Sequence, residues 1–246
     1  HELNRTARTD YDQADRPCQT ELRDDANGEA LYKTNLKYNK LNQLEMFSEQ
    51  TDGETHKTEF AYDRDNRVTG ITYDGSAHKV NYTYDELGRV KIRTVECGED
   101  TGKVTNIYTY VPGGYGVNSS TPLVWQIMQE KIGLEYEYDS RGNITSEKRG
   151  DLTTTYQYDA LGQLIRVNDP HENATWVYNY DRGGNITSKV KYAYTTGAVG
   201  TAIETIPYVY GDSNWKDKLT SYNGQTITYD AIGNPLNDGT WTYMWQ

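Results

Sequence analysis

The stretch YQYDALGQLIRV, residues 156–167, recurs through this chain of 246 residues. Nearly the same wording returns as YTYDELGRVKIRT at 82–94, YEYDSRGNITSEK at 136–148, YNYDRGGNITSKV at 178–190 and ITYDAIGNPLN at 227–237. Self-similarity at a spacing of about 20 to 50 residues is the signature of repeat architectures. These copies therefore decide the fold, and the rest of the chain is interpreted around them.

Alignment on the Tyr-Asp pair extends the series over most of the chain. Weaker copies begin at Tyr11 and Tyr38, and degenerate ones, YTYVPGG and YVYGDSN, begin at Tyr108 and Tyr208. The sequence thus predicts about ten units, each of roughly 20 to 30 residues.

Each unit has the pattern of a β-hairpin. Leu152, Thr154, Tyr156 and Tyr158 alternate with other residues, and a period of two indicates a strand. In the following Asp-Ala-Leu-Gly, the aspartate is expected to accept hydrogen bonds from the backbone ahead of it, and Gly162 to supply a positive φ. A second strand then returns, so each copy predicts strand, tight turn, strand.

The structural positions of the repeat follow from this alignment. They are the tyrosine, the aspartate and, where present, the glycine of each clear copy: Tyr62, Asp63, Tyr84, Asp85, Gly88, Tyr138, Asp139, Gly142, Tyr158, Asp159, Gly162, Tyr180, Asp181, Gly184, Tyr229, Asp230 and Gly233.

Three copies have another residue in the glycine position, namely Asp15, Asn42 and Asn66. Asp and Asn are among the few non-glycine residues that tolerate the left-handed region. The substitutions therefore favour the same turn. Residues 122–139 (PLVWQIMQEKIGLEYEYD) have no clean helical period, and we expect strand, turn, strand there as well, divided at Gly133.

Composition limits what such a chain forms. Only 35% of residues are apolar, mean hydropathy is −0.91, and the 23 tyrosines far outnumber the two phenylalanines. About twenty strands at ~4.8 Å each would make a ribbon on the order of 90 Å wide. Open twisted sheets rarely exceed about ten strands without curling. We therefore expect an all-β chain forming one long, strongly curled antiparallel sheet with partly wet faces, as a single repeat region over residues 1–246.

Charge and hydropathy exclude several classes of partner. A net charge of −11, without clustered Lys and Arg, argues against nucleic acid. No apolar run approaches the ~18 residues of a membrane span. Cys18 and Cys97 lie in hairpins far apart in the series, and we predict free thiols.

The pattern Y-x-Y-D-x-x-G resembles the YD-repeat, or Rhs, family, and the resemblance extends over nearly the whole chain. The stretches YGDSNWKDKLTSYNGQTITYDAIGNPL from Tyr210 and WTYMWQ from Trp241 strengthen it. Similar repeats occur in the C components of Tc toxin complexes and in teneurins. The resemblance implies a β-ribbon forming part of a hollow shell, an enclosed C-terminal toxin or effector as partner, and a secreted or cell-surface location.

One feature of the bacterial family does not transfer to this chain. There the toxin is released by an aspartyl protease in a segment carrying D-P-x-G. The only Asp-Pro here, Asp169-Pro170, is followed by His171-Glu172 and lies between hairpins. Neither the protease nor the toxin is assigned to these residues. The chain, which opens in HELNRTARTDYD, is interpreted as an internal fragment of a longer shell.

Catalytic and metal chemistry find little support in the sequence. The aspartates recur at the first turn position, which favours a turn role over general acid or base catalysis. His56, His78 and His171 have no HxxxH or CxxC partners, so we expect no metal and no cofactor. Cys97 has no neighbouring histidine in the sequence, and no G-x-S-x-G is present.

Two functions stay open. The favoured one is a non-catalytic shell segment that encloses or presents an effector. The alternative is an adhesion module that uses tyrosine and tryptophan to bind glycans or a cell surface. Pairing of tyrosines across neighbouring strands is the simpler explanation of their number, because they follow the repeat rather than form one patch.

Overall fold

The computed structural model describes residues 5–23, 28, 30–51, 53–75, 78–98, 102–114 and 120–245. Within these residues the chain is all-β, with 21 strands and no helix, as the repeat predicts. It divides into two compact units, His1–Ile132 and Gly133–Gln246. Each unit is described by itself below, and the expectation of a single repeat region stays a prediction.

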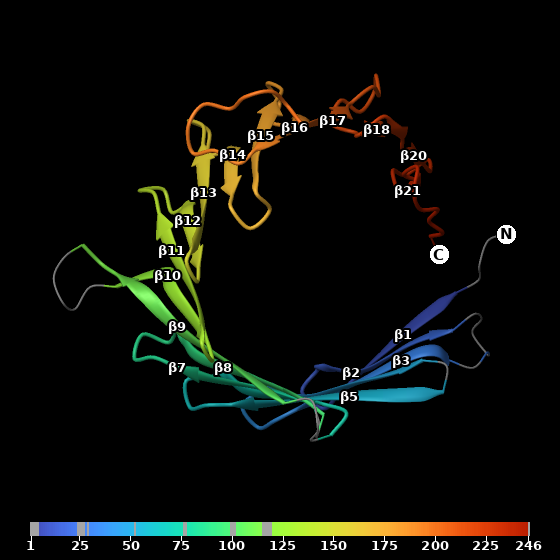
Figure 1. Ribbon diagram of the computed structural model, residues 1–246. Helices are drawn as coiled ribbons and strands as arrows, with labels where there is room; N and C mark the ends of the chain where they lie inside the picture. The colour runs from blue at the N-terminus through green and yellow to red at the C-terminus, as the bar shows by residue number, and fades with distance from the viewer. Residues whose placement is uncertain are drawn as a thin grey trace. The chain divides into compact units, whose positions relative to one another are not determined.

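Unit 1 is a meander in which consecutive strands pair antiparallel (Figure 1). Its strands are β1 (Thr6–Tyr11), β2 (Pro17–Arg23), β3 (Ala30–Tyr38), β4 (Leu44–Thr51), β5 (Glu54–Tyr62), β6 (Val68–Tyr73), β7 (His78–Tyr84), β8 (Val90–Cys97), β9 (Lys103–Pro112) and β10 (Ser120–Gln129).

Unit 2 continues the same construction from β11 to β19, with a separate two-stranded sheet of β20 and β21. Its strands are β11 (Ile132–Tyr138), β12 (Ile144–Arg149), β13 (Leu152–Tyr158), β14 (Leu164–Asp169), β15 (Ala174–Tyr180), β16 (Ile186–Ala193), β17 (Glu204–Val209), β18 (Ser221–Tyr222), β19 (Gln225–Thr226), β20 (Thr228–Tyr229) and β21 (Pro235–Asn237).

One predicted boundary was wrong. Residues 122–139 form strand, turn, strand as expected, but the turn lies between β10 and β11 at Glu130, whose φ is +52°. Gly133 lies inside β11, and its backbone is part of the strand. The tight turn therefore uses a non-glycine residue in the left-handed region, which a search for glycine does not find.

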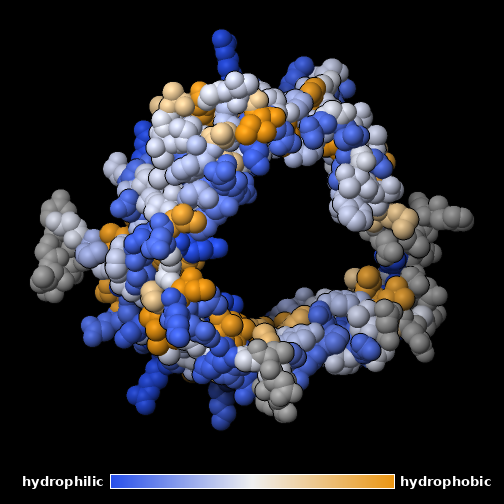
Figure 2. Space-filling view, viewed as in Figure 1, coloured by the Kyte–Doolittle hydropathy of each residue, from blue (hydrophilic) through white to orange (hydrophobic). Residues whose placement is uncertain are grey.

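The sheet has almost no apolar core. Among described residues, the buried apolar side chains are Ala174, Val190 and Ile206, and more polar residues than apolar ones are buried. Figure 2 shows apolar residues in small groups among hydrophilic ones. Since so few of the described side chains are buried, the structure depends on hydrogen bonds and on contacts between neighbouring strands rather than on a thick interior.

The exception is a segment of unit 2, residues 194–203, which we call the strap. It connects β16 to β17 and lies over Asn168 and Thr175, whose exposed fractions are 2% and 0%. Arg166 donates to the carbonyls of Thr195 and Gly197 at 2.8 and 2.7 Å. Thr175 exchanges hydrogen bonds with the backbone of Thr195 at 3.0 Å. The strap gives unit 2 its most buried patch, and that patch is polar.

Candidate functional site

The repeated turns after each tyrosine are the most regular feature of the structure, and we call them Tyr-Asp turns. In each, the amide of the first residue donates to the carbonyl four residues ahead, and the amide of the fourth residue donates back to the carbonyl of the first. The first residues of these turns are Asp12, Asn39, Asp63, Asp85, Asp139, Asp159, Asp181 and Asp230.

The fourth position has a left-handed backbone in every Tyr-Asp turn, as the sequence predicted. For the predicted glycines, φ is +79° at Gly88, +88° at Gly142, +82° at Gly162, +91° at Gly184 and +95° at Gly233. The substitutes Asp15, Asn42 and Asn66 have φ values of +57°, +65° and +67°. Residues able to adopt this region are therefore required here, and glycine is the least strained of them.

The aspartate side chain caps the turn. Asp63 Oδ1 accepts from the amides of Asp65 and Arg67, both at 2.9 Å, while Oδ2 accepts from the Arg67 guanidinium at 2.7 Å. In the turn that begins at Asp139, an asparagine replaces the arginine: Asn143 Nδ2 donates to Asp139 Oδ2 at 2.9 Å. The sequence indicated the backbone capping, but not the side-chain partner four residues ahead.

These bonds stabilise the ionised aspartates. Hydrogen bonds from the backbone and side chain of Arg67 hold the pKa of Asp63 below its ordinary value. The side chain and backbone of Asn143 do the same for the pKa of Asp139. A carboxylate that is ionised and saturated with donors is a structural acceptor, and it is poorly suited to take up a proton in catalysis.

The tyrosine before most of these turns connects neighbouring hairpins. Its hydroxyl donates to a backbone carbonyl of the preceding hairpin, that of the first residue in the hairpin's second strand. Tyr158 makes this bond to Ile144 at 2.9 Å, and Tyr180 makes it to Leu164 at 2.7 Å. The same bond joins Tyr62 to Leu44, Tyr84 to Val68 and Tyr110 to Val90, and Tyr229 makes a similar one to Leu219. Burial raises the pKa of Tyr84, Tyr158 and Tyr180, so these phenols stay protonated donors.

Arginines extend the contact between turns in unit 1. Arg16, Arg67 and Arg89 each pair with the aspartate of their own turn, and each guanidinium lies over the tyrosine of a following hairpin, at 4.5 Å from Tyr38, 4.7 Å from Tyr84 and 4.0 Å from Tyr110. Ion pairing and cation–π contact together favour one fixed orientation of neighbouring turns.

The expectation that tyrosines pair with one another was largely wrong. In the described part of the chain one tyrosine–tyrosine contact is found, between Tyr208 and Tyr222, with ring centroids 5.0 Å apart. The phenols before the turns instead reach backbone carbonyls, and arginine covers several rings. One of the tryptophans, Trp176, has the Lys189 ammonium 3.8 Å from its ring centroid.

The sheet brings together two of the remaining residues singled out in the sequence, because His78 and Cys97 are direct register partners on neighbouring strands and line one pocket with Tyr73. His78 begins β7, Cys97 ends β8, and His171 lies in the turn between β14 and β15. Cys18 and Cys97 are free cysteines. Among described residues, no three His, Cys, Asp or Glu side chains are grouped so as to hold a metal ion. The same residues contain no helix long and apolar enough to cross a membrane.

Comparison with known proteins agrees with the repeat. Residues 138–174 and 158–196 match the family described as RHS Repeat. The chain is 34% identical over 89 residues to the tRNA3(Ser)-specific nuclease WapA of Bacillus spizizenii and to the tRNA nuclease WapA of Bacillus subtilis. The match covers 36% of this chain, and the chain spans about 3% of the length of these relatives.

Solved structures show the same fold. The Tc holotoxin pore of Photorhabdus luminescens aligns with a TM-score of 0.64 at 18% identity, over 96% of this chain and 14% of that one. A TcdB2-TccC3 complex with Cdc42 aligns with a TM-score of 0.51 at 15% identity, over 95% of this chain and 17% of that one. Taken with the repeated Tyr-Asp turns, these findings support assignment of the chain to the YD-repeat, or RHS-repeat, family, whose model matches residues 138–196.

Proposed function

We propose that this chain is a structural segment of a shell wall that encloses or presents a C-terminal toxin or effector. The observation that carries the proposal is the wall-like construction of each unit: consecutive hairpins fixed to one another by Tyr-Asp turns, with scarcely any apolar core. Such a sheet has little interior of its own, and a thin wall of this kind is suited to separating two spaces. Similarity to Tc toxin structures supports this role.

In this proposal the meander continues as one strongly curled sheet, residues 1–246 are one repeat region within a longer protein, and the Tyr-Asp turns are its structural positions. The segment itself is non-catalytic. The nuclease named in the WapA relatives is a property of those proteins, and the part that matches here is a repeat region. An extracellular or cell-surface location is proposed from the family alone.

Glycan or cell-surface binding is the less favoured alternative. Hydroxyls of tyrosines before the Tyr-Asp turns, such as Tyr158 and Tyr180, already donate to backbone carbonyls rather than to a ligand. The ammonium of Lys189 lies over the ring of Trp176. Screening of this chain on a glycan array addresses the alternative directly. We expect no saturable binding, and a defined glycan bound at micromolar concentration would favour adhesion.

Limited proteolysis of the complete protein in which this segment occurs tests the shell. We expect a C-terminal portion that co-elutes with the wall in size exclusion and resists protease until the wall is unfolded in urea. A Gly162→Val variant, which weakens one turn, is the matched control and should lose protection at lower urea. Immediate digestion of the C-terminal portion in the native protein would contradict the proposal.

A further inference from the structure

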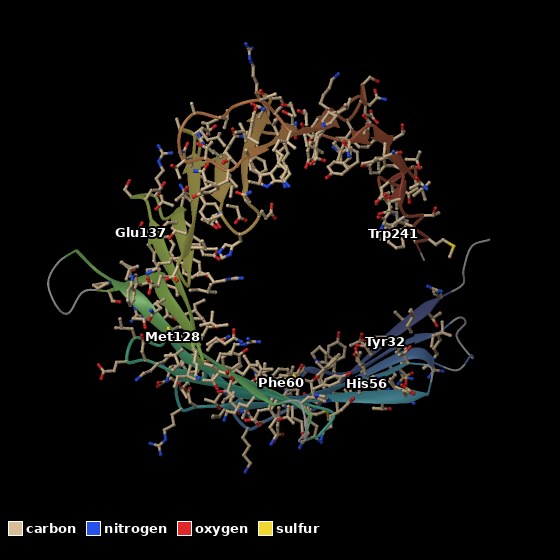
Figure 3. The ribbon with its side chains drawn as sticks, viewed as in Figure 1. Tyr32, His56, Phe60, Met128, Glu137 and Trp241 are labelled. Carbon is tan, nitrogen blue, oxygen red and sulfur yellow. The ribbon has the colours of Figure 1, made fainter. Side chains whose placement is uncertain are left out.

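The open end of the β5–β6 hairpin in unit 1 carries a histidine–carboxylate contact that the repeat does not explain. It lies at the opposite end of these strands from the Tyr-Asp turn that begins at Asp63. His56 Nδ1 is 2.6 Å from Asp74 Oδ2. His56 is on the same face of β5 as Phe60, four residues further along the strand (Figure 3).

Asp74 holds two consecutive residues of β5 at once. While one carboxylate oxygen contacts His56, Oδ1 accepts from the Lys57 amide at 2.6 Å, and the Asp74 amide donates to the Lys57 carbonyl at 2.8 Å. The backbone of Asp74 is left-handed, with a φ of +45°. Aspartate tolerates this region better than most residues, so its side chain and its backbone together set the end of β6 against β5.

The charges around His56 come from several elements. Glu49 on β4 is its direct register partner, Glu54 begins β5 with its carboxylate 3.9 Å from His56 Nε2, and Asp74 follows β6. Tyr73 stacks on the imidazole with ring centroids 5.7 Å apart.

A second histidine, His78 on β7, has its ring centroid 6.5 Å from that of Tyr73. Three carboxylates therefore face His56, and a proton on the imidazole is favoured.

We propose that His56 and Asp74 form a proton-controlled clasp, which holds the ends of β5 and β6 together when His56 is charged and weakens when it is neutral. The neutral imidazole still donates a hydrogen bond, but it loses the charge assistance that makes such bonds strong. The hydrogen bond that His56 donates to Asp74, followed by the negative charges of Asp74, Glu54 and Glu49, raises the pKa of His56.

The sign of the pH dependence follows from the raised pKa of His56. A group with a raised folded-state pKa contributes stability that is fully present below its unfolded pKa and is lost as pH rises through the folded value. The clasp is thus tight in mildly acidic solution and loosens above the ordinary histidine pKa of 6.5. This behaviour is opposite in sign to that of Asp63 and Asp139, whose pKa values are lowered.

Amide exchange and histidine titration by NMR on the whole chain test the clasp. The His56 ring should titrate with a midpoint above 6.5. Protection of the Lys57 amide, corrected for intrinsic exchange, should fall with rising pH, by up to tenfold for each pKa unit by which the folded value exceeds the unfolded one.

Two variants should abolish this dependence. His56→Gln is neutral at every pH, whereas Asp74→Asn removes the charge but keeps an acceptor for Lys57 and a residue that tolerates positive φ. His78→Gln is the matched control and should behave as the parent chain. A His56 midpoint at or below 6.5, a dependence that persists in His56→Gln, or one that disappears in His78→Gln would overturn the proposal.

Discussion

Replacing Gly162 by valine isolates the conformational demand of a Tyr-Asp turn. The backbone there has a φ of +82°, and a Cβ added to it would meet no atom within 4 Å. Steric conflict with neighbours is therefore absent, and the whole cost is that of placing a side chain in the left-handed region. That cost is about 1 to 2 kcal/mol for an ordinary L-residue, and a β-branched residue belongs at its upper end.

Gly162→Asn is the matched control, because Asn42 and Asn66 already occupy this position with φ values of +65° and +67°. We expect asparagine to cost less than about 1 kcal/mol. Urea titration, together with exchange of the amide that Gly162 donates to the Asp159 carbonyl, measures both variants. Equal stability of the valine and asparagine variants would refute the conclusion that the turn selects for positive φ.

Further substitutions test the other contacts of the wall. Gly233→Ala should destabilise more than Gly162→Ala in the same urea titration, because its Cβ would lie 2.7 Å from the Trp215 ring; an equal cost would mean that the ring moves freely aside. Tyr180→Phe removes the 2.7 Å bond to the Leu164 carbonyl and should cost about 0.5 to 1.5 kcal/mol, whereas Tyr11→Phe, at a tyrosine 61% exposed, should cost almost nothing. Hydrogen bonds from the Lys218 side chain and from the Trp215 and Asn214 backbone lower the pKa of Asp212 from 3.8 to about 2, so its contribution should be lost as pH falls between these values. In acid unfolding, the Asp212→Asn variant should lack the loss of stability that protonation of Asp212 causes. An acid unfolding profile identical to that of the parent chain would contradict this role of Asp212.

Much of the fold follows from local sequence. Tyr-Asp pairs and the residue with positive φ identify the hairpins, because turn chemistry admits few residue types at that position. Alternation in 152–158 identifies the strand before the turn. The boundary at Glu130 escaped prediction because its positive φ comes from a residue that seldom adopts it.

Contacts between hairpins were not predictable in the same way. A repeated tyrosine shows that a phenol is needed, but not that its hydroxyl reaches a carbonyl in the preceding hairpin, as Tyr158 reaches Ile144. The strap over Asn168 and the contact of His56 with Asp74 depend on residues that strand pairing alone brings together. Such contacts depend on register, and register across several strands is not contained in any single window of sequence.

Electron cryomicroscopy of the complete protein in which this segment occurs tests the shell most directly. We expect residues 1–246 to form part of a continuous curled wall, with density for a C-terminal portion on the enclosed side. An open ribbon whose C-terminal portion is folded outside it, accessible to solvent on every face, would contradict the shell.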